Sequence, residues 1–271
     1  MKFSRMLGGR LGKAAERARY LVPLWCRAWL SPCTGPNGER LPHRQRPLAP
    51  CIICGTTRFQ RWSGARPLSF SGRLQSCVRC RSLPRHRSMR KIWLHLRRQD
   101  SKRARCLQFS RDPSVRRTWF RDFELSIFNG ANSIDVQDIA RADASYDIVI
   151  CNHVVEHVPD HRRALRELGR ILSAHGFLFL SVPDPARRAR TEDWGRPDPT
   201  RHHHFREFGA DLAELLKQEL PDLSIVEVRA VDDATGDPDL AYVLTRNRTW
   251  FRRVRSLPFT LRVHAERPFA A

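Results

Sequence analysis

Apolar and polar residues alternate in blocks along residues 146–183, the most strongly patterned stretch of the chain. The first block, Tyr146–Cys151, is short and rich in β-branched residues, which predicts a strand buried on both faces. Asp160 stands where a helix would be capped, and apolar residues then recur at helical spacing: Ala164, Leu165, Leu168 and Leu172. We expect Gly176 to end this helix and Phe177–Val182 to form a second buried strand.

Two buried strands joined through a helix predict a parallel sheet with helices on its faces. The same alternation extends on both sides, with strands predicted over residues 104–109, 124–128, 133–135, 223–229 and 240–245, and helices over residues 114–123 and 209–220. We therefore predict an α/β fold built on a Rossmann-like, doubly wound sheet of seven strands. Ligands of such sheets bind at the carboxyl ends of the strands, which singles out the polar loop at residues 151–160.

Composition divides the chain into four segments. Residues 1–48 are predicted to be a basic tail and a linker rich in Pro and Gly. Residues 49–100 hold four cysteines and a basic helix over residues 82–98, with an apolar stripe that should pack against the main domain: Met89, Ile92, Trp93 and Leu96. An arginine-rich groove for nucleic acid is the alternative use of this helix. Residues 101–245 form the α/β domain, and residues 246–271, with seven basic groups and one acid, are expected to be a tail.

The net charge of +21 is unevenly distributed. Residues 1–105 carry 25 Lys and Arg against three acids, whereas residues 106–271 carry 24 basic and 25 acidic groups. The basic third suits a polyanionic partner such as nucleic acid, anionic lipid or acidic glycan, and it equally suits a solvated arginine-rich arm. No apolar run reaches the ~18 residues needed to span a bilayer, so we expect no transmembrane segment and a cytoplasmic protein.

Two Cys-x-x-Cys pairs, Cys51–Cys54 and Cys77–Cys80, are separated by 22 residues. Each pair can offer both sulfurs to one ion from a tight turn, which predicts a structural zinc site with four thiolate ligands. Gly55 follows the first pair, where such a turn often needs a positive φ. Two disulfides are the alternative, which a reducing cytosol disfavours. Cys26 and Cys33 have no partner spacing and are expected to be free thiols.

Two motifs carry a family resemblance. The first is a spaced set of acids and their neighbours, and the second is a polar loop after the buried strand: Asp135, Asp138, Asp143, Ser145 and Asp147, then Asn152, His153, Glu156, His157 and Asp160. Flanked downstream by His203, His204 and Arg206, these motifs make residues 50–245 resemble a class I S-adenosylmethionine-dependent methyltransferase of the type 11 subset, preceded by a zinc ribbon.

The resemblance implies S-adenosylmethionine as the cofactor. The acid matching Asp135 accepts a hydrogen bond from the adenine amino group in that family, and the loop matching Cys151–His153 passes the methionine end. The residues implied at the cofactor are Phe109, Ser110, Asn129, Asp135, Val136, Asn152 and His153. The region near His204 lines the acceptor pocket, and methyl transfer to oxygen or nitrogen often needs a base. His157 and His204 are the two candidate bases.

The chain departs from the family pattern in three places. Phe109–Pro113 replaces the glycine-rich turn after the first strand, and glycines there allow close approach of the backbone to the cofactor. No carboxylate ends the second strand to hold the ribose hydroxyls, and Asn129 is the nearest polar residue. Ala174-His175-Gly176 replaces the usual Pro-Gly-Gly.

The string His153-Val-Val-Glu156-His157 also matches the H-x-x-E-H motif of inverted zinc proteases. That chemistry needs both histidines on one helix face, and this string instead lies between a strand and Pro159. A divalent ion held by Glu156 and His157, as in some quinone-biosynthesis methyltransferases, is disfavoured because those relatives carry an acid at the position of His153. We expect Glu156 to orient the loop, and the tract His202–His204 to form a pocket wall instead of a metal site.

The sequence thus predicts a methyltransferase that acts on a small molecule or a sugar-like group of a glycan, by O- or N-methylation. The alternative, from a different class, is a non-catalytic methyltransferase-like fold that binds RNA or another polyanion through its basic zinc-ribbon half. The missing glycines and the basic third favour the alternative. The acidic pattern of Asp135–Asp147 favours the enzyme.

Overall fold

The computed structural model describes residues 47–63, 68–97, 99–130 and 132–269. Cys26, Cys33 and all but the last two residues of the predicted tail and linker lie outside these ranges. The chain separates into two compact units. One holds the described residues up to Pro84 together with Asp233–Asp237, and the other holds Arg85–Asp232 and residues 238 onward.

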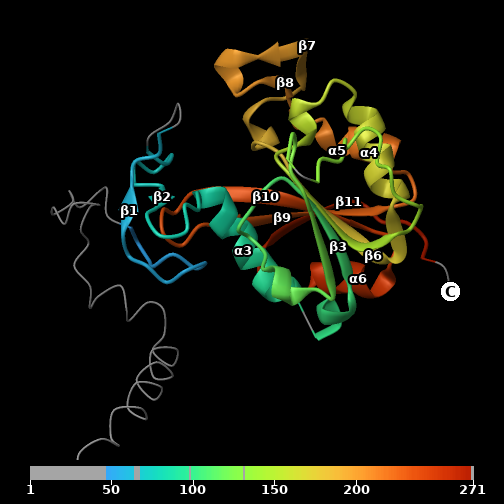
Figure 1. Cartoon of the computed structure of the whole chain (residues 1–271), viewed down its shortest axis with the longest axis horizontal. Coiled ribbons are helices and arrows are strands. Elements are labelled where there is room, and N and C mark those ends of the chain that lie inside the picture. Colours follow the sequence, from blue (N-terminus) through green and yellow to red (C-terminus); the bar gives the residue numbers. More distant parts are fainter. Residues whose placement is uncertain (1–46, 64–67, 98, 131, 270–271) are drawn as a thin grey trace, which may run out of the picture. The chain divides into compact units, whose positions relative to one another are not determined.

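The larger unit is built on a mixed sheet of seven strands in the order β11-β9-β10-β6-β5-β3-β4 (Figure 1). The strands are β3 (Arg105–Phe109), β4 (Asp122–Ser126), β5 (Tyr146–Asn152), β6 (Leu172–Ser181), β9 (Ser224–Val231), β10 (Pro238–Thr245) and β11 (Thr260–Ala265). Strands β4, β3, β5 and β6 pair in parallel. Strand β10 runs antiparallel to β6 and β9, and β11 runs antiparallel to β9. This architecture fits the predicted Rossmann-like fold.

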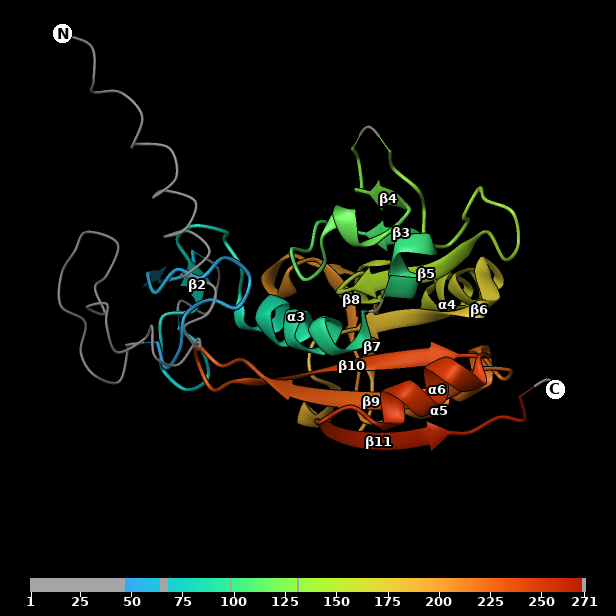
Figure 2. The same ribbon diagram turned by 90° about the horizontal axis from the view of Figure 1, so that it is seen from below.

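Helices cover both faces of this sheet (Figures 1 and 2). Alternate residues of β5 enter opposite cores, because successive side chains of a strand point to opposite faces: Val149 lies in the core with α4 (His161–Arg170) and α5 (Leu212–Glu219), and Ile150 lies in the core with α3 (Pro84–Leu96) and α6 (Arg248–Arg255). Both cores are continuous under their helices. The prediction of a doubly covered sheet is therefore confirmed.

Helix α3 packs through the predicted stripe of Met89, Ile92, Trp93 and Leu96, all buried. The Trp93 ring lies 4.9 Å from the Phe179 ring and 5.6 Å from the Phe177 ring, centroid to centroid. Aromatic pairs at such distances add about 0.5–1.5 kcal/mol beyond the burial of their area. Trp93 thus anchors the helix to β6.

The helix predicted after β5 begins where expected and ends earlier. Asp160 caps α4 by accepting a hydrogen bond of 2.9 Å from the Arg163 amide. The helix ends at Arg170, and Gly176 lies inside β6 instead of ending the helix. A Cβ atom on Gly176 would come within 2.0 Å of the Asp147 carbonyl oxygen. This glycine is therefore required by the close approach of β5 and β6.

Two predicted elements near the amino half of the sheet are wrong. The helix expected over residues 114–123 is reduced to a 3-10 turn, η3 (Arg117–Trp119), because Val115 and Phe120 pack into the core on either side of it. Residues 133–135 form no strand: the Ile134 amide bonds to the Ser126 side-chain oxygen at 2.9 Å instead of a neighbouring backbone. Strand β4 is consequently the edge of the sheet.

The basic tail expected over residues 246–271 is also wrong. Those residues contain α6 and the edge strand β11, which supplies the seventh strand. Phe251 and Val254 of α6 are buried, whereas Arg252 and Arg255 are exposed. Phe251 and Val254 stand at helical spacing, but the many arginines around them give the segment the composition of a charged tail.

A separate two-stranded hairpin, β7 (Glu192–Asp198) and β8 (His204–Glu207), was not predicted. It brings the histidine tract next to the loop after β5 (Figure 1).

Among the described residues, no helix is long and apolar enough to cross a membrane.

The smaller unit contains a two-stranded antiparallel sheet of β1 (Phe59–Gln60) and β2 (Ser76–Cys77). The segment 233–237, between β9 and β10, completes this unit. Its Asp237 carboxylate accepts hydrogen bonds from the amides of Phe70 and Ser71, at 2.7 and 3.0 Å. Ala234 joins its small core beside Phe59.

Candidate functional site

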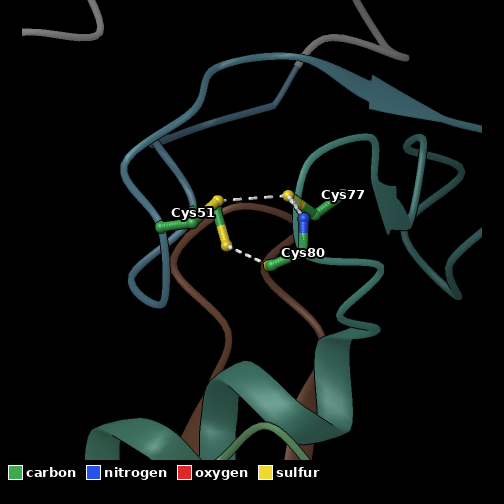
Figure 3. Close-up of side chains that lie close together, drawn as sticks. Cys51, Cys77 and Cys80 are labelled. Carbon is green, nitrogen blue, oxygen red and sulfur yellow. Dashed lines mark hydrogen bonds between the residues drawn. The ribbon is translucent and has the colours of Figure 1, made fainter.

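The four predicted cysteine ligands come together in the smaller unit. Figure 3 shows three of them, Cys51, Cys77 and Cys80. Their sulfurs all lie within 4.8 Å of one another, with 3.6 Å between Cys51 and Cys80 and 3.4 Å between Cys54 and Cys77. All four are free cysteines, and these distances far exceed the ~2.05 Å of a disulfide. A tetrahedral site with bonds of about 2.3 Å would place its sulfurs about 3.8 Å apart. The cluster could therefore hold a zinc ion after small adjustments.

The two cysteine pairs are built on equivalent turns. The Gly55 amide donates to the Cys51 carbonyl at 2.7 Å, and the Arg81 amide donates to the Cys77 carbonyl at 2.9 Å. Both residues four positions after the first cysteine have positive φ, 78° at Gly55 and 59° at Arg81. The positive φ predicted for Gly55 is thus confirmed. Hydrogen bonds from Cys54 and Cys77 lower the pKa of the Cys51 thiol to about 6.

A second polar site lies at the carboxyl ends of β3 and β5. Phe109 and Cys151 are paired across these strands, so the turns that follow them are neighbours. Ser110 and His153 both adopt left-handed backbone, with φ of 64° and 52°. Non-glycine residues with such backbone are uncommon and cluster at ligand sites. Ser110 therefore takes up the conformation that a glycine would favour in the turn where the family's glycines are missing.

A buried pair of polar side chains joins these two turns. The side-chain amide of Asn152 donates a hydrogen bond to the Asp112 carboxylate at 2.7 Å, and the Ser181 hydroxyl donates to the side-chain oxygen of Asn152 at 3.0 Å. Asp112 also accepts from the Ser114 amide at 2.6 Å. The loop after β3 is thereby fixed to β5 and β6. Asp112 was not among the predicted site residues, although its place directly after the first strand is a usable signal.

The remaining predicted cofactor residues follow β4. Val136 is buried in the same core as Phe109. Asn129 lies exposed in the turn after β4, where its backbone amide donates a hydrogen bond to the Ser133 hydroxyl at 3.1 Å. Asp135 is also exposed, and one of its carboxylate oxygens accepts from the Gln137 amide at 2.8 Å. Asn129 and Asp135 thus bond within their own segment.

Glu156 and the two predicted catalytic histidines form a third polar group. Glu156 and His157 belong to the 3-10 turn η4 (Val155–His157), and His204 begins β8. The His157 and His204 rings meet edge to face at 4.5 Å between centroids. Burial lowers the pKa of both histidines, that of His204 to about 4. Burial pushes the pKa of Glu156 up, and the adjacent His153 ring outweighs this and holds it below its ordinary value.

Arg206 fixes this turn to the hairpin. Its guanidinium, almost fully buried, donates to the carbonyl oxygens of Val155, Val158 and Pro159 at 3.1, 2.5 and 2.8 Å. It also donates to the Asp193 carboxylate at 2.7 Å. Arg206 was not among the predicted site residues. Its spacing of two from His204 places both on one face of β8, a signal that the sequence does contain.

A cavity of about 480 Å³ lies at the other end of the strands, beside the amino ends of β3, β4 and β5. It is lined by charged and aromatic side chains, among them Arg105, Arg117, Glu124 and Tyr146. Tyr146 and Arg141 both donate hydrogen bonds to the Glu124 carboxylate. None of the predicted cofactor residues lines this cavity.

Residues 85–219 match a family model described as a methyltransferase domain. The matched span holds β3 to β6, the β7–β8 hairpin and every predicted cofactor and catalytic residue. The curated relatives below point the same way. These matches support a class I methyltransferase. The smaller unit lies outside the matched residues.

Curated relatives match over a shorter span. A probable S-adenosylmethionine-dependent methyltransferase of Mycobacterium tuberculosis is 36% identical over 83 residues, which is 30% of this chain and 29% of that protein. A ubiquinone biosynthesis O-methyltransferase of Xanthomonas oryzae pv. oryzae is 36% identical over 91 residues, 30% of this chain and 38% of that protein. The matched part thus spans less than two fifths of the length of either relative.

Among solved structures, a 1,6-didemethyltoxoflavin-N1-methyltransferase of Burkholderia thailandensis, bound to its substrate and S-adenosylhomocysteine, has a TM-score of 0.41. It is 16% identical, and the match covers 58% of this chain and 77% of that one.

Proposed function

We propose that the chain is an S-adenosylmethionine-dependent methyltransferase whose cofactor binds at the carboxyl ends of β3 and β5. One observation carries the proposal: the neighbouring turns at Ser110 and His153 are both left-handed and are tied together by the Asn152–Asp112 hydrogen bond. Ligands of sheets of this type bind at this edge. The turns lie within the residues that match the methyltransferase domain.

The cofactor supplies an electrophilic methyl group on a sulfonium ion, and the chain's own residues bind and orient it. In this proposal Asp135 accepts a hydrogen bond from the adenine amino group, which its exposed carboxylate leaves possible. Phe109, Ser110, Val136, Asn152 and His153 surround the rest of the cofactor, with Asn129 toward the ribose. Because Asn152 is held on both sides by Asp112 and Ser181, the loop toward the methionine end is fixed before the cofactor arrives.

The acceptor proposed is a small molecule or a sugar-like group of a glycan. One curated relative is a ubiquinone biosynthesis O-methyltransferase, which supports a small-molecule acceptor. The atom proposed to receive the methyl group is an oxygen or a nitrogen. His157 and His204 lie on the turn and strand that would face the acceptor. Either imidazole is proposed to take a proton from the acceptor.

Cys51, Cys54, Cys77 and Cys80 are proposed to bind one structural zinc ion. Four thiolates complete a tetrahedron and leave no open position, so this metal would stabilise the smaller unit without taking part in catalysis. The basic N-terminal third is proposed to make at most weak contacts with polyanions, which ~0.2 M salt should largely abolish.

Calorimetry on the full chain with S-adenosylmethionine and S-adenosylhomocysteine tests the cofactor proposal. We expect one binding site per chain for each compound. A folded protein that binds neither compound, and that binds RNA tightly in ~0.2 M salt, would overturn the proposal in favour of a non-catalytic polyanion-binding protein, the alternative that the comparisons do not favour.

A further inference from the structure

The Glu156 carboxylate lies in an unusual environment. Its residue is fully buried, and within the described part of the chain neither carboxylate oxygen has a hydrogen-bond donor of good geometry. The nearest basic group is the His153 ring, whose Nδ1 lies 3.4 Å from Oε1. An ionised carboxylate taken out of water without partners costs several kcal/mol. This arrangement calls for a positive group that would sit against both oxygens.

Two imidazole rings converge on the same place. Ligand atoms of Glu156, His157 and His204 all lie within 4.8 Å of one another. Nδ1 of His204 is itself buried and has no hydrogen-bond partner among the residues described. His157 is the most accessible of the three and leaves a route from solvent. Three potential metal-ligand atoms, one oxygen and two nitrogens, therefore lie close enough together to share one ion.

The surroundings hold these donors in position. The His157 ring packs edge to face against the His204 ring, with 4.5 Å between centroids, which restricts the orientation of both rings. Arg206 fixes both ends of the turn that carries Glu156, through the carbonyls of Val155 and Pro159. The site is thus built from two rigidly joined segments.

We propose that Glu156, His157 and His204 bind one divalent transition-metal ion, with zinc and manganese as the leading candidates. A carboxylate and two imidazoles form a donor set typical of such ions, and three protein ligands leave a position open to solvent or another ligand. The ion would neutralise the Glu156 carboxylate. While the ion is bound, neither histidine can accept a proton through its ligating nitrogen, so the base role proposed above belongs to the metal-free protein. The site does not depend on cofactor binding and is separate from the four-cysteine cluster.

Zinc titration of the full chain, with the cysteine cluster already saturated with zinc, tests the proposal. We expect one further equivalent of zinc per chain by calorimetry, and a rise in melting temperature on its addition. Glu156→Gln and His204→Ala should each weaken binding of this equivalent at least a hundredfold and leave the cysteine-bound zinc in place. His175→Ala removes an exposed histidine on β6 and should leave the titration unchanged.

The metal-free proteins give an independent readout. Glu156→Gln removes the buried charge, so metal-free Glu156→Gln should melt higher than metal-free wild type and show no response to zinc. If Glu156 instead pairs with a protonated histidine, Glu156→Gln should melt lower, and the wild type should bind no further zinc. That result would overturn the proposal, and so would a further equivalent of zinc that both Glu156→Gln and His204→Ala retain. Should Glu156→Gln fail to fold, loss of the equivalent in His204→Ala alone decides the question.

Discussion

Arg206 donates a hydrogen bond of 3.1 Å from its buried guanidinium to the carbonyl oxygen of Val155, a residue 51 positions earlier in the chain. Further bonds from the same group reach Val158, Pro159 and the Asp193 carboxylate. A single side chain therefore joins the β7–β8 hairpin to the loop after β5. This contact brings His204 next to Glu156 and His157.

Replacement of Arg206 by Met should lower the free energy of unfolding by about 2–3 kcal/mol, because it leaves buried carbonyl oxygens without donors. Amide hydrogen exchange should also speed up at His157, whose own segment is no longer fixed. Arg196→Met is the matched control, since Arg196 is exposed on the same hairpin and its loss should cost less than ~0.5 kcal/mol. Equal effects of the two substitutions in urea unfolding would contradict this account.

Asp135→Ala tests the adenine contact. Loss of a charge-assisted hydrogen bond of about 1.5–3 kcal/mol should weaken S-adenosylhomocysteine binding roughly ten- to a hundredfold in calorimetry. Asp138→Ala is the control, because this nearby carboxylate is 79% exposed and pairs with Arg163 on the surface. If Asp135→Ala binds the cofactor as tightly as Asp138→Ala does, Asp135 lies outside the site.

Features that depend on residues close in sequence could be predicted. The Asp160 cap, the buried stripe of α3 and the turn at Gly55 all follow from local chemistry. Features that depend on residues distant in sequence could not be predicted. Strand β11 is defined by its pairing with β9, and no local pattern distinguishes it from a basic tail.

The same limit applies to the site. The cysteine spacing and the loop after β5 identify their residues from sequence alone. The position of His204 beside Glu156 depends on the β7–β8 hairpin and on Arg206, and neither can be placed by periodicity. Ser110 is a further case, since only the backbone shows that a serine takes the left-handed conformation there.

Gly176→Ala should destabilise the larger unit. The added methyl would lie 2.0 Å from the Asp147 carbonyl oxygen, a backbone atom that cannot swing away. Forcing β5 and β6 apart should cost about 1–3 kcal/mol, measured by urea unfolding. Ala174→Ser, at an exposed position two residues earlier, should have little effect. Wild-type stability in Gly176→Ala would mean that the two strands separate easily here.

Asp211 gives a pH-dependent prediction. Burial would raise the pKa of this carboxylate, but hydrogen bonds from the Thr191 amide and hydroxyl, at 2.9 and 2.7 Å, outweigh it and lower the pKa. Because the pKa of Asp211 is lower in the folded state, the stabilisation that its ionised carboxylate gives is fully present above the unfolded value of ~3.9. It is lost as the pH falls below that value. Asp211→Asn should therefore cost about 1 kcal/mol at pH 7 and progressively less below pH ~4.

Zinc removal should unfold the smaller unit before the larger one. The smaller unit has a core of few residues around Phe59 and Leu74, so a bound metal would supply much of its stability, whereas the larger unit has two extensive cores. Cys51→Ser should lower the zinc content below one per chain and remove the sulfur-only shell near 2.3 Å that X-ray absorption should detect in the wild type. The near-UV circular dichroism from the packed aromatic residues of the larger unit, such as Trp93, should persist. Cys33→Ser should keep its zinc, and purified protein with no zinc and paired cysteines would refute the assignment.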